Sequence, residues 1–316
     1  MDSSSSKPVH ANGRLSLLGL MGVHITLTGG GYVVNKLALR EFHPLAFGFW
    51  RLIIGLIGLL LLTKWASAWP KIEKRDWTRV ILLAAVAVPV NQLIYLYGMS
   101  MTVPSHASLL YGTTAVFALF LSAALGYERI MRHKVLAIAV SLSGLALVVT
   151  RGGQFDVNSS VFTGDVLIFA AVLAWATYTV LGKPLVIKYG AVPATCVLLI
   201  VGTVISLPFL ITSAVHQDYS GITWIGWGGA LYSGLLLTVV AYIVWYRILS
   251  KIDPSQVAIL TTPQPVVATF LSSFFVGEVI GWPLVIGGLL VIIGVILMDA
   301  PAFVRRAGEF RRKVVG

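Results

Sequence analysis

The sequence predicts an all-α, polytopic membrane protein with ten transmembrane helices arranged as two inverted five-helix repeats. Three observations support this prediction. Of the 316 residues, 57% are hydrophobic and 11% are charged, whereas a soluble domain has about 25% charged residues. Ten apolar stretches approach or exceed the roughly 20 residues that a helix needs to cross a bilayer. One stretch of 25 residues also recurs at the same place in both halves of the chain.

The recurring stretch runs from Pro104 to Glu128 and aligns without a gap with the stretch from Pro254 to Glu278. Nine of the 25 positions are identical. The identical pairs include Pro104 and Pro254, Ser105 and Ser255, Ser122 and Ser272, and Glu128 and Glu278. The chain is therefore expected to contain two copies of one unit, displaced by 150 residues.

The ten stretches define the expected elements and domains. The spans are 15–37, 44–64, 78–98, 104–125 and 133–150 in the first repeat, and 163–182, 191–213, 223–247, 255–276 and 282–300 in the second. The domains are a disordered tail at 1–14, a first five-helix repeat at 15–150, a second at 163–300 and a basic tail at 301–316. The apolar run from Leu15 is too long for a signal-peptide core, so we expect it to be retained as the first span.

Positive charge is distributed unevenly between the two sides of these spans. Nineteen of the 23 Lys and Arg residues fall in the two tails and in the loops on one side. The positive-inside rule therefore places both termini in the cytoplasm. This distribution accounts for the net charge of +11 without nucleic acid as a partner. Because each repeat has an odd number of spans, the two repeats are expected to have opposite orientations in the membrane.

Both copies of the recurring stretch are interrupted at matching places. Positions 112–114 read Gly-Thr-Thr, and positions 262–264 read Thr-Pro-Gln, with Pro265 following. Proline lacks a backbone N–H, so Pro263 and Pro265 leave the carbonyls of Ile259 and Thr261 without helical partners. In lipid such carbonyls must find other partners or face a cavity. Paired interruptions of this kind indicate the substrate site of a transporter.

The chain resembles the drug/metabolite transporter superfamily in its ten-span EamA form. The resemblance rests on the two copies ending in Glu128 and Glu278, on GGGYVVNK in the first span, on HPLAFGFWR with Arg51, and on AVLAWATYTVLGK in the second repeat. Within that family the chain looks most like the YddG-type exporters of aromatic and other amino acids. The resemblance implies a central cavity lined by both repeats, export of amino acids by alternating access, and a place in the cytoplasmic (inner) membrane.

The interruptions supply the first candidate binding residues. Gln264 either holds the carboxylate and ammonium groups of an amino acid, together with the carbonyls freed by Pro263 and Pro265, or satisfies a neighbouring backbone group in a helix that is merely kinked. At the matching place of the first copy the candidates are Gly112, Thr113 and Thr114.

Aromatic side chains inside or near the ends of spans form a second set. They are Tyr95, Tyr111, Trp175, Tyr178, Tyr242 and Trp245. Such rings either stack on an apolar substrate and close over an ammonium group or pack between helices. Gly30, in the middle of a glycine triplet, allows either a close approach to the substrate or tight helix packing.

Ionisable side chains inside spans are functional candidates by default. His24 either carries a coupling proton or is a neutral, hydrogen-bonded core residue. Arg51 either reaches the surface or pairs with a carboxylate during gating. Glu128 and Glu278 end helices, where we expect gating or structural roles, whereas Asp165 and Asp299 lie near membrane boundaries and are expected to be solvated.

Other classes of protein fit the sequence less well. It has no metalloprotease motif, no phosphate-binding loop and no Cys/His cluster, and Cys196 is its one cysteine, so we expect neither an enzyme nor a bound metal or cofactor. An exporter of cationic drugs or other metabolites, and a channel, remain the alternatives. We expect the chain to act as a monomer on small solutes, with proton antiport and uniport both open.

Overall fold

The structure is a computed structural model that describes residues 11–65, 71–127, 132–149, 159–252, 254, 257, 263–294 and 296–297. Residues 11–18, 145 and 149 are described by their main chain alone. Within these ranges the chain forms helices joined by short turns, and none of the described residues lies in a β-strand. The predicted all-α class is confirmed.

The helices follow the predicted spans closely. Those of the first half are α1 (Ala11–Ala38), α2 (Pro44–Trp65), η1 (Lys74–Asp76), α3 (Trp77–Ala85), η2 (Val86–Leu93), α4 (Ile94–Met101), α5 (Pro104–Gly112), α6 (Thr114–Ala124) and α7 (Arg132–Val149). Those of the second half are α8 (Ser160–Tyr189), α9 (Ala191–His216), α10 (Trp224–Leu231), η4 (Tyr232–Ala241), α11 (Tyr242–Leu249), α13 (Gln264–Phe275) and a last helix at Trp282–Gly294. Each predicted span overlaps one of these helices or a continuous run of them.

Six helical segments of the described chain are long and apolar enough to cross a membrane. They are Pro44–Trp65, Lys74–Met101, Pro104–Ala124, Ser160–Tyr189, Ala191–His216 and Trp224–Leu249. Large apolar side chains such as Leu61, Phe209 and Phe274 are exposed on these and neighbouring helices. An apolar outer surface is favourable next to lipid tails, which are as apolar as leucine.

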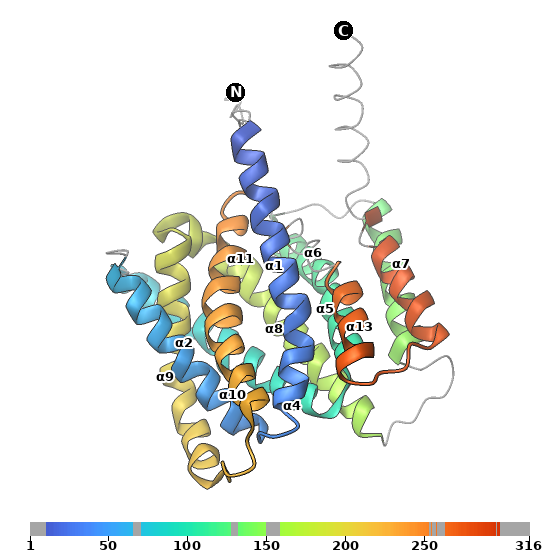
Figure 1. The fold of residues 1–316 in the computed structure, drawn as a ribbon. Coiled ribbons are helices and arrows are strands. Elements are labelled where there is room, and N and C mark those ends of the chain that lie inside the picture. The colour runs from blue at the N-terminus through green and yellow to red at the C-terminus, as the bar shows by residue number, and fades with distance from the viewer. Residues whose placement is uncertain are drawn as a thin grey trace, which may run out of the picture.

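The helices pack as one bundle (Figure 1). Helix α1 lies at the front beside α13 and also contacts η4, α10, α4 and α5. Helices α2 and α9 pack together at one edge, and α8 packs against α4, α6 and η2. The helices of the two halves are therefore interleaved, and the faces they share enclose the centre of the bundle.

The interruption predicted at 112–114 is present. Helix α5 ends at Gly112 and α6 begins at Thr114, with the Thr113 N–H bonded to the Leu110 carbonyl in a tighter turn. In the second copy α13 begins at Gln264, directly after a turn at Pro263. Ile259 and Thr261, whose carbonyls were expected to be free, lie outside the described residues.

A π-helical segment interrupts the corresponding helix of each half. In the first half it is η2, which contains Pro89, and in the second it is η4. Displaced by the 150-residue period, residues 86–91 coincide with residues 236–241. π-helical turns often occur at functional sites, because the extra residue redirects side chains and frees backbone groups.

One hydrogen bond joins matching positions of the two halves, and another recurs within each half. Gln92 Nε2 donates to the hydroxyl of Tyr242 at 3.1 Å, and these positions are 150 residues apart. Residues at matching positions of the two recurring units are therefore in direct contact. Lys36 donates to the carbonyl of Thr102 (2.6 Å), and Lys183 donates to that of Ile252 (3.1 Å), the residue equivalent to Thr102.

Helix α7 and the last helix approach each other in the same reciprocal way. A Cβ added to Gly144 would lie 2.5 Å from the carbonyl oxygen of Gly287, and one added to Gly294 would lie 2.6 Å from that of Ala137. Gly144 is equivalent to Gly294, and Ala137 to Gly287, so the two contacts exchange under the repeat. Only small residues allow two helices to approach this closely.

Candidate functional site

A polar and aromatic cavity of about 90 Å³ lies at the centre of the bundle. One water molecule needs roughly 10–15 Å³ on this measure, so the cavity has room for a small solute. Its walls come from both halves of the chain. The lining residues are His24, Thr28, Gly31, Tyr32, Asn35, Arg51, Asn91, Gln92, Tyr95, Tyr111, Trp175, Leu237, Ala241, Tyr242 and Gln264.

Three tyrosines form one wall. Their ring centroids are 6.3 Å apart for Tyr32 and Tyr95, 6.0 Å for Tyr32 and Tyr111, and 5.8 Å for Tyr95 and Tyr111, each pair edge-to-face. The amides of Asn35 and Asn91 donate to the hydroxyls of Tyr95 (3.1 Å) and Tyr111 (3.0 Å). The wall is therefore held by packing and hydrogen bonds before any substrate arrives.

Gln264 links this wall to the first turn of α13. Its Oε1 accepts a hydrogen bond from the Tyr32 hydroxyl at 3.3 Å, and its side chain is buried at the first turn of α13. Gln264 therefore lines the cavity and bonds a side chain of this wall.

A second aromatic wall also lines the cavity. Trp175 from α8 and Tyr242 from α11 line the cavity with ring centroids 5.1 Å apart. Trp245 lies behind them, 5.3 Å from Trp175 and 5.1 Å from the His24 ring. Rings in such a wall offer flat apolar surface to a substrate and a partial negative charge to a cation.

Arg51 has neither of the two environments expected for it. Its side chain does not reach the surface, being only 5% exposed, and it lines the cavity. Its Nε donates to Thr238 Oγ1 at 3.1 Å, and none of the described ion pairs includes it. A membrane-embedded guanidinium with no carboxylate partner in the described chain is unusual, because a buried unpaired charge is costly.

Several predicted residues lie just outside the cavity. Tyr178 and Trp245 are fully buried behind Trp175, and Tyr178 stacks on Tyr246 with ring centroids 5.0 Å apart. Gly30 faces Tyr232 and Leu271 in a helix contact, and its neighbour Gly31 lines the cavity instead.

The interruption residues pack around the site. The hydroxyls of Thr113 and Thr114 donate across the break to the carbonyls of Leu110 and Tyr111 at the end of α5. Gly112 faces Val291 and Pro265. Pro263 is exposed, and Pro265 borders an apolar hollow of about 290 Å³ with Val266, Phe270 and other apolar residues. That hollow is larger than the central cavity, but it lacks the charged and amide groups that would orient a solute.

Five polar lining residues were missed by the sequence reasoning. They are Thr28, Tyr32, Asn35, Asn91 and Gln92. Each lies inside an apolar span, where a polar side chain requires a buried partner. That signal was present for the three amides, and applying it would have identified them.

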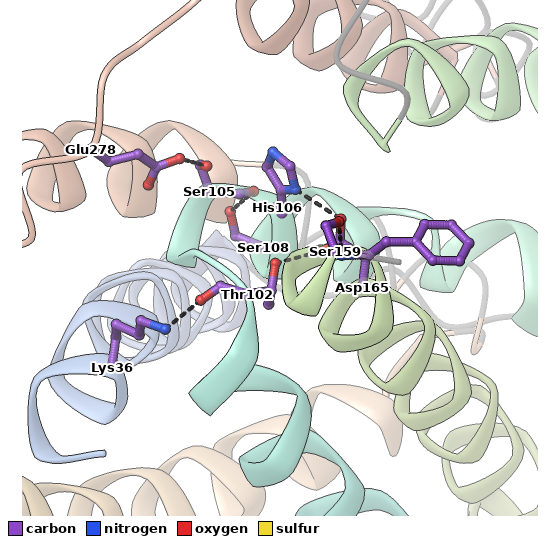
Figure 2. A network of polar contacts seen from close by, with 9 residues as sticks. Lys36, Thr102, Ser105, His106, Ser108, Ser159, Asp165 and Glu278 are labelled. Carbon is purple, nitrogen blue, oxygen red and sulfur yellow. Dashed lines mark hydrogen bonds and ion pairs between the residues drawn. The ribbon is translucent and has the colours of Figure 1, made fainter. Parts of the chain in front are cut away.

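A polar network lies at the ends of α1, α4, α5 and α8 (Figure 2). Lys36 Nζ donates to the carbonyls of Met99 (3.1 Å), Ser100 (3.0 Å) and Thr102 (2.6 Å), which cap the end of α4. Asp165 accepts from the Thr102 hydroxyl and contacts His106 Nδ1 at 2.9 Å. Asp165 is only 3% exposed, so the expectation that it is solvated is wrong: the start of α8 is covered by the chain around Thr102 and His106.

Glu278 joins this network from the loop after α13. Its carboxylate accepts from the hydroxyl of Ser105, at the start of α5, and from that of Ser272 at 2.5 Å. Partial burial raises the pKa of Glu278 from its ordinary value. The loop of the second repeat is thus tied to the first repeat. Its predicted counterpart Glu128 and Asp299 lie outside the described residues.

Comparison with known proteins agrees with this architecture. The sequence model of the EamA-like transporter family matches residues 16–150 and 162–298.

No group of three or more His, Cys, Asp or Glu side chains in the described ranges is placed to hold a metal ion.

Curated relatives match over most of their length. An uncharacterized transporter of Archaeoglobus fulgidus is 26% identical, covering 89% of this chain and 96% of its own. Uncharacterized transporter YetK of Bacillus subtilis is 28% identical, covering 86% of each. A protein of Streptantibioticus cattleyicolor named as a probable terminal-alkyne amino-acid exporter is 26% identical, covering 73% of this chain and 76% of its own. A solved crystal structure has the same fold, with a TM-score of 0.68 and 17% identity over 93% of this chain and 99% of that one.

Proposed function

Because the chain belongs to the EamA-like transporter family, whose members are transporters and not enzymes, we propose that it exports amino acids, above all neutral and aromatic ones, across the cytoplasmic membrane. The observation that carries this proposal is the central cavity, which combines two aromatic walls with Arg51 and buried amides. One relative is named as an amino-acid exporter, which supports the same class of cargo.

The proposed topology is ten spans in two inverted five-helix repeats, with both termini in the cytoplasm and one chain as the working unit. The reciprocal contacts at Gly144 and Gly294, the matching π-helical segments and the bias of Lys and Arg toward one side support it. In this arrangement the Gln92–Tyr242 pair lies at the bilayer midplane, where inverted-repeat transporters bind their substrates.

The proposed mechanism is alternating access. One set of helices rocks against the other around the cavity, exposing the cavity to each side in turn. The polar network around Glu278 acts as a closing contact, because it joins α5 of the first repeat to the loop after α13 of the second. Export then requires that Glu278 and Ser105 separate when this end opens.

The test is uptake of labelled amino acids, tryptophan and threonine included, into liposomes that contain the purified protein. Unlabelled amino acid trapped inside should stimulate saturable uptake, and a pH gradient shows whether protons are coupled. Gln264→Ala and Trp175→Phe are expected to reduce uptake, whereas Trp224→Phe, at an exposed position outside the cavity, is the matched control.

Each outcome bears on a different part of the proposal. Unchanged uptake in both cavity variants would remove the cavity as the site. Uptake that does not saturate and shows no counterflow would indicate a channel. Absence of amino-acid uptake by the wild type would overturn the cargo and direct the search to cationic drugs and other metabolites.

A further inference from the structure

Three buried polar atoms of the cavity have no hydrogen-bond partner among the described residues. They are Nη1 of Arg51, Oε1 of Gln92 and Nδ1 of His24. The great majority of buried polar side-chain atoms in folded proteins are paired, so an unpaired one requires an explanation. Three of the nine such atoms among the described residues belong to residues that line this one cavity, where a bound solute would complete their hydrogen bonding.

Arg51 sets the charge of that ligand. The lining residues include no Asp or Glu, so the cavity itself supplies no carboxylate to Arg51. An arginine presents a planar set of N–H donors that fits a carboxylate in a two-point contact. A cationic solute would add to the unpaired charge, whereas an anionic group would neutralise it.

Gln92 supplies the complementary group. Its Nε2 donates to the Tyr242 hydroxyl at 3.1 Å, and this bond directs Oε1 away as an unused acceptor. Arg51, Gln92 and Tyr242 all line the same cavity, so the cationic donor and the free acceptor both border the space that a ligand would occupy. A ligand that satisfies both must carry an acceptor and a donor a short distance apart.

We propose that Arg51 and Gln92 form the subsite for the head group of a zwitterionic α-amino acid. The carboxylate binds the guanidinium of Arg51, and the ammonium group donates to Gln92 Oε1, with the aromatic walls on either side of the substrate side chain. Arg51 is then a substrate-binding residue. The direction of transport in this inference rests on the proposed function, whereas the binding of the head group does not depend on it.

The experiment measures binding to the purified full chain with three ligands that share one aromatic group. L-Tryptophan carries both charges, tryptamine lacks the carboxylate, and indole-3-propionate lacks the ammonium group. We expect each analogue to bind about 10- to 100-fold more weakly than L-tryptophan, the range for losing a charge-assisted hydrogen bond. Tryptamine binding as tightly as L-tryptophan would overturn the carboxylate subsite, with no variant needed.

Variants then assign the groups. Arg51→Gln is expected to weaken L-tryptophan by about 10- to 100-fold and not to weaken tryptamine, which has no carboxylate to lose and is relieved of a like charge. Gln92→Leu is expected to weaken L-tryptophan and tryptamine and to spare indole-3-propionate. Arg79→Gln is the matched control, since Arg79 binds the Leu181 carbonyl (2.8 Å) outside the cavity.

The two proposals fail in different ways. Head-group discrimination without any amino-acid uptake by liposomes would contradict the transport proposal and keep the subsite. Amino-acid uptake in which tryptophan and tryptamine compete equally would keep the transport proposal and remove the subsite. Equal weakening of all three ligands by Arg51→Gln would indicate a structural role for Arg51.

Discussion

The central cavity and the polar network of Figure 2 contain similar buried groups in opposite states. In the network Lys36 has three carbonyl acceptors, Asp165 has Thr102 and His106, and Glu278 has Ser105 and Ser272. In the cavity Arg51 and Gln92 each keep an unpaired polar atom. The difference teaches that the protein itself satisfies the charged groups of the network, whereas the cavity keeps polar atoms that the proposed solute would satisfy.

The largest expected effect is loss of stability when the network is broken. Asp165→Ala removes both bonds of a carboxylate that is 3% exposed and leaves His106 and Thr102 unpaired. Removing one partner of a buried pair costs about 3–5 kcal/mol. Thermal unfolding of the purified protein should therefore shift down by many degrees. Asp218→Ala, in an exposed loop, is the control. An unchanged Tm for Asp165→Ala would show that the network is not structural.

The next-largest effect is expected in the cavity, where a substitution should abolish binding without lowering stability. Arg51→Gln removes an uncompensated buried charge and loses one bond, to Thr238. These terms oppose each other, so we expect a Tm equal to or above that of the wild type even though tryptophan binding is lost. A strong fall in Tm would mean that Arg51 is paired within the protein, and the contrast between the two regions would break down.

Glu278→Gln should change how stability depends on pH. Burial raises the pKa of Glu278, against opposing contributions from its Ser272 bond and from His106 and Lys36. An acid with a raised folded-state pKa holds its proton more strongly when folded. Its contribution to stability is therefore present below the ordinary Glu pKa of about 4.3 and is lost as pH rises through the raised value. As pH rises through this window, the Tm of Glu278→Gln should fall less than that of the wild type. Superimposable profiles of Tm against pH would contradict this expectation.

The smallest effect is expected at the far end of α8. Lys188 bridges Glu73 (2.9 Å) and Asp76 (2.5 Å) at the surface. Exposed ion pairs are screened by water and salt, so Lys188→Gln should leave binding and uptake unchanged and alter Tm by little. A loss of binding in this variant would show that charges remote from the cavity also set affinity.

The fold was largely predictable because its signals are strong in the sequence. Apolar runs locate the helices, and the displaced copies anticipate the paired contacts at Gly144 and Gly294. The break at Thr113 also followed from its residues. The π-helical segments were not foreseen. A change of hydrogen-bond register within a helix has no characteristic amino-acid composition, and the one local signal in η2 is Pro89.

The types of residue in the candidate site were predictable from the sequence, but the directions in which their side chains point were not. His24, Tyr95, Tyr111, Trp175, Tyr242 and Gln264 line the cavity as candidate binding residues, and Arg51 lines it although a gating role was expected. A step of one residue turns a helix position by about 100°. This rotation explains why Gly31 lines the cavity and Gly30 does not. Packing likewise decides that Trp175 lines the cavity, whereas Tyr178 is buried behind it.

The most direct test of the central claim is an experimental structure of the protein with L-tryptophan bound. The account predicts the amino acid in the central cavity, with its carboxylate within hydrogen-bonding distance of Arg51, its ammonium group at Gln92 Oε1 and its ring between the two aromatic walls. Tryptophan bound in the apolar hollow beside Pro265, or in the central cavity with its ammonium group toward Arg51, would contradict it.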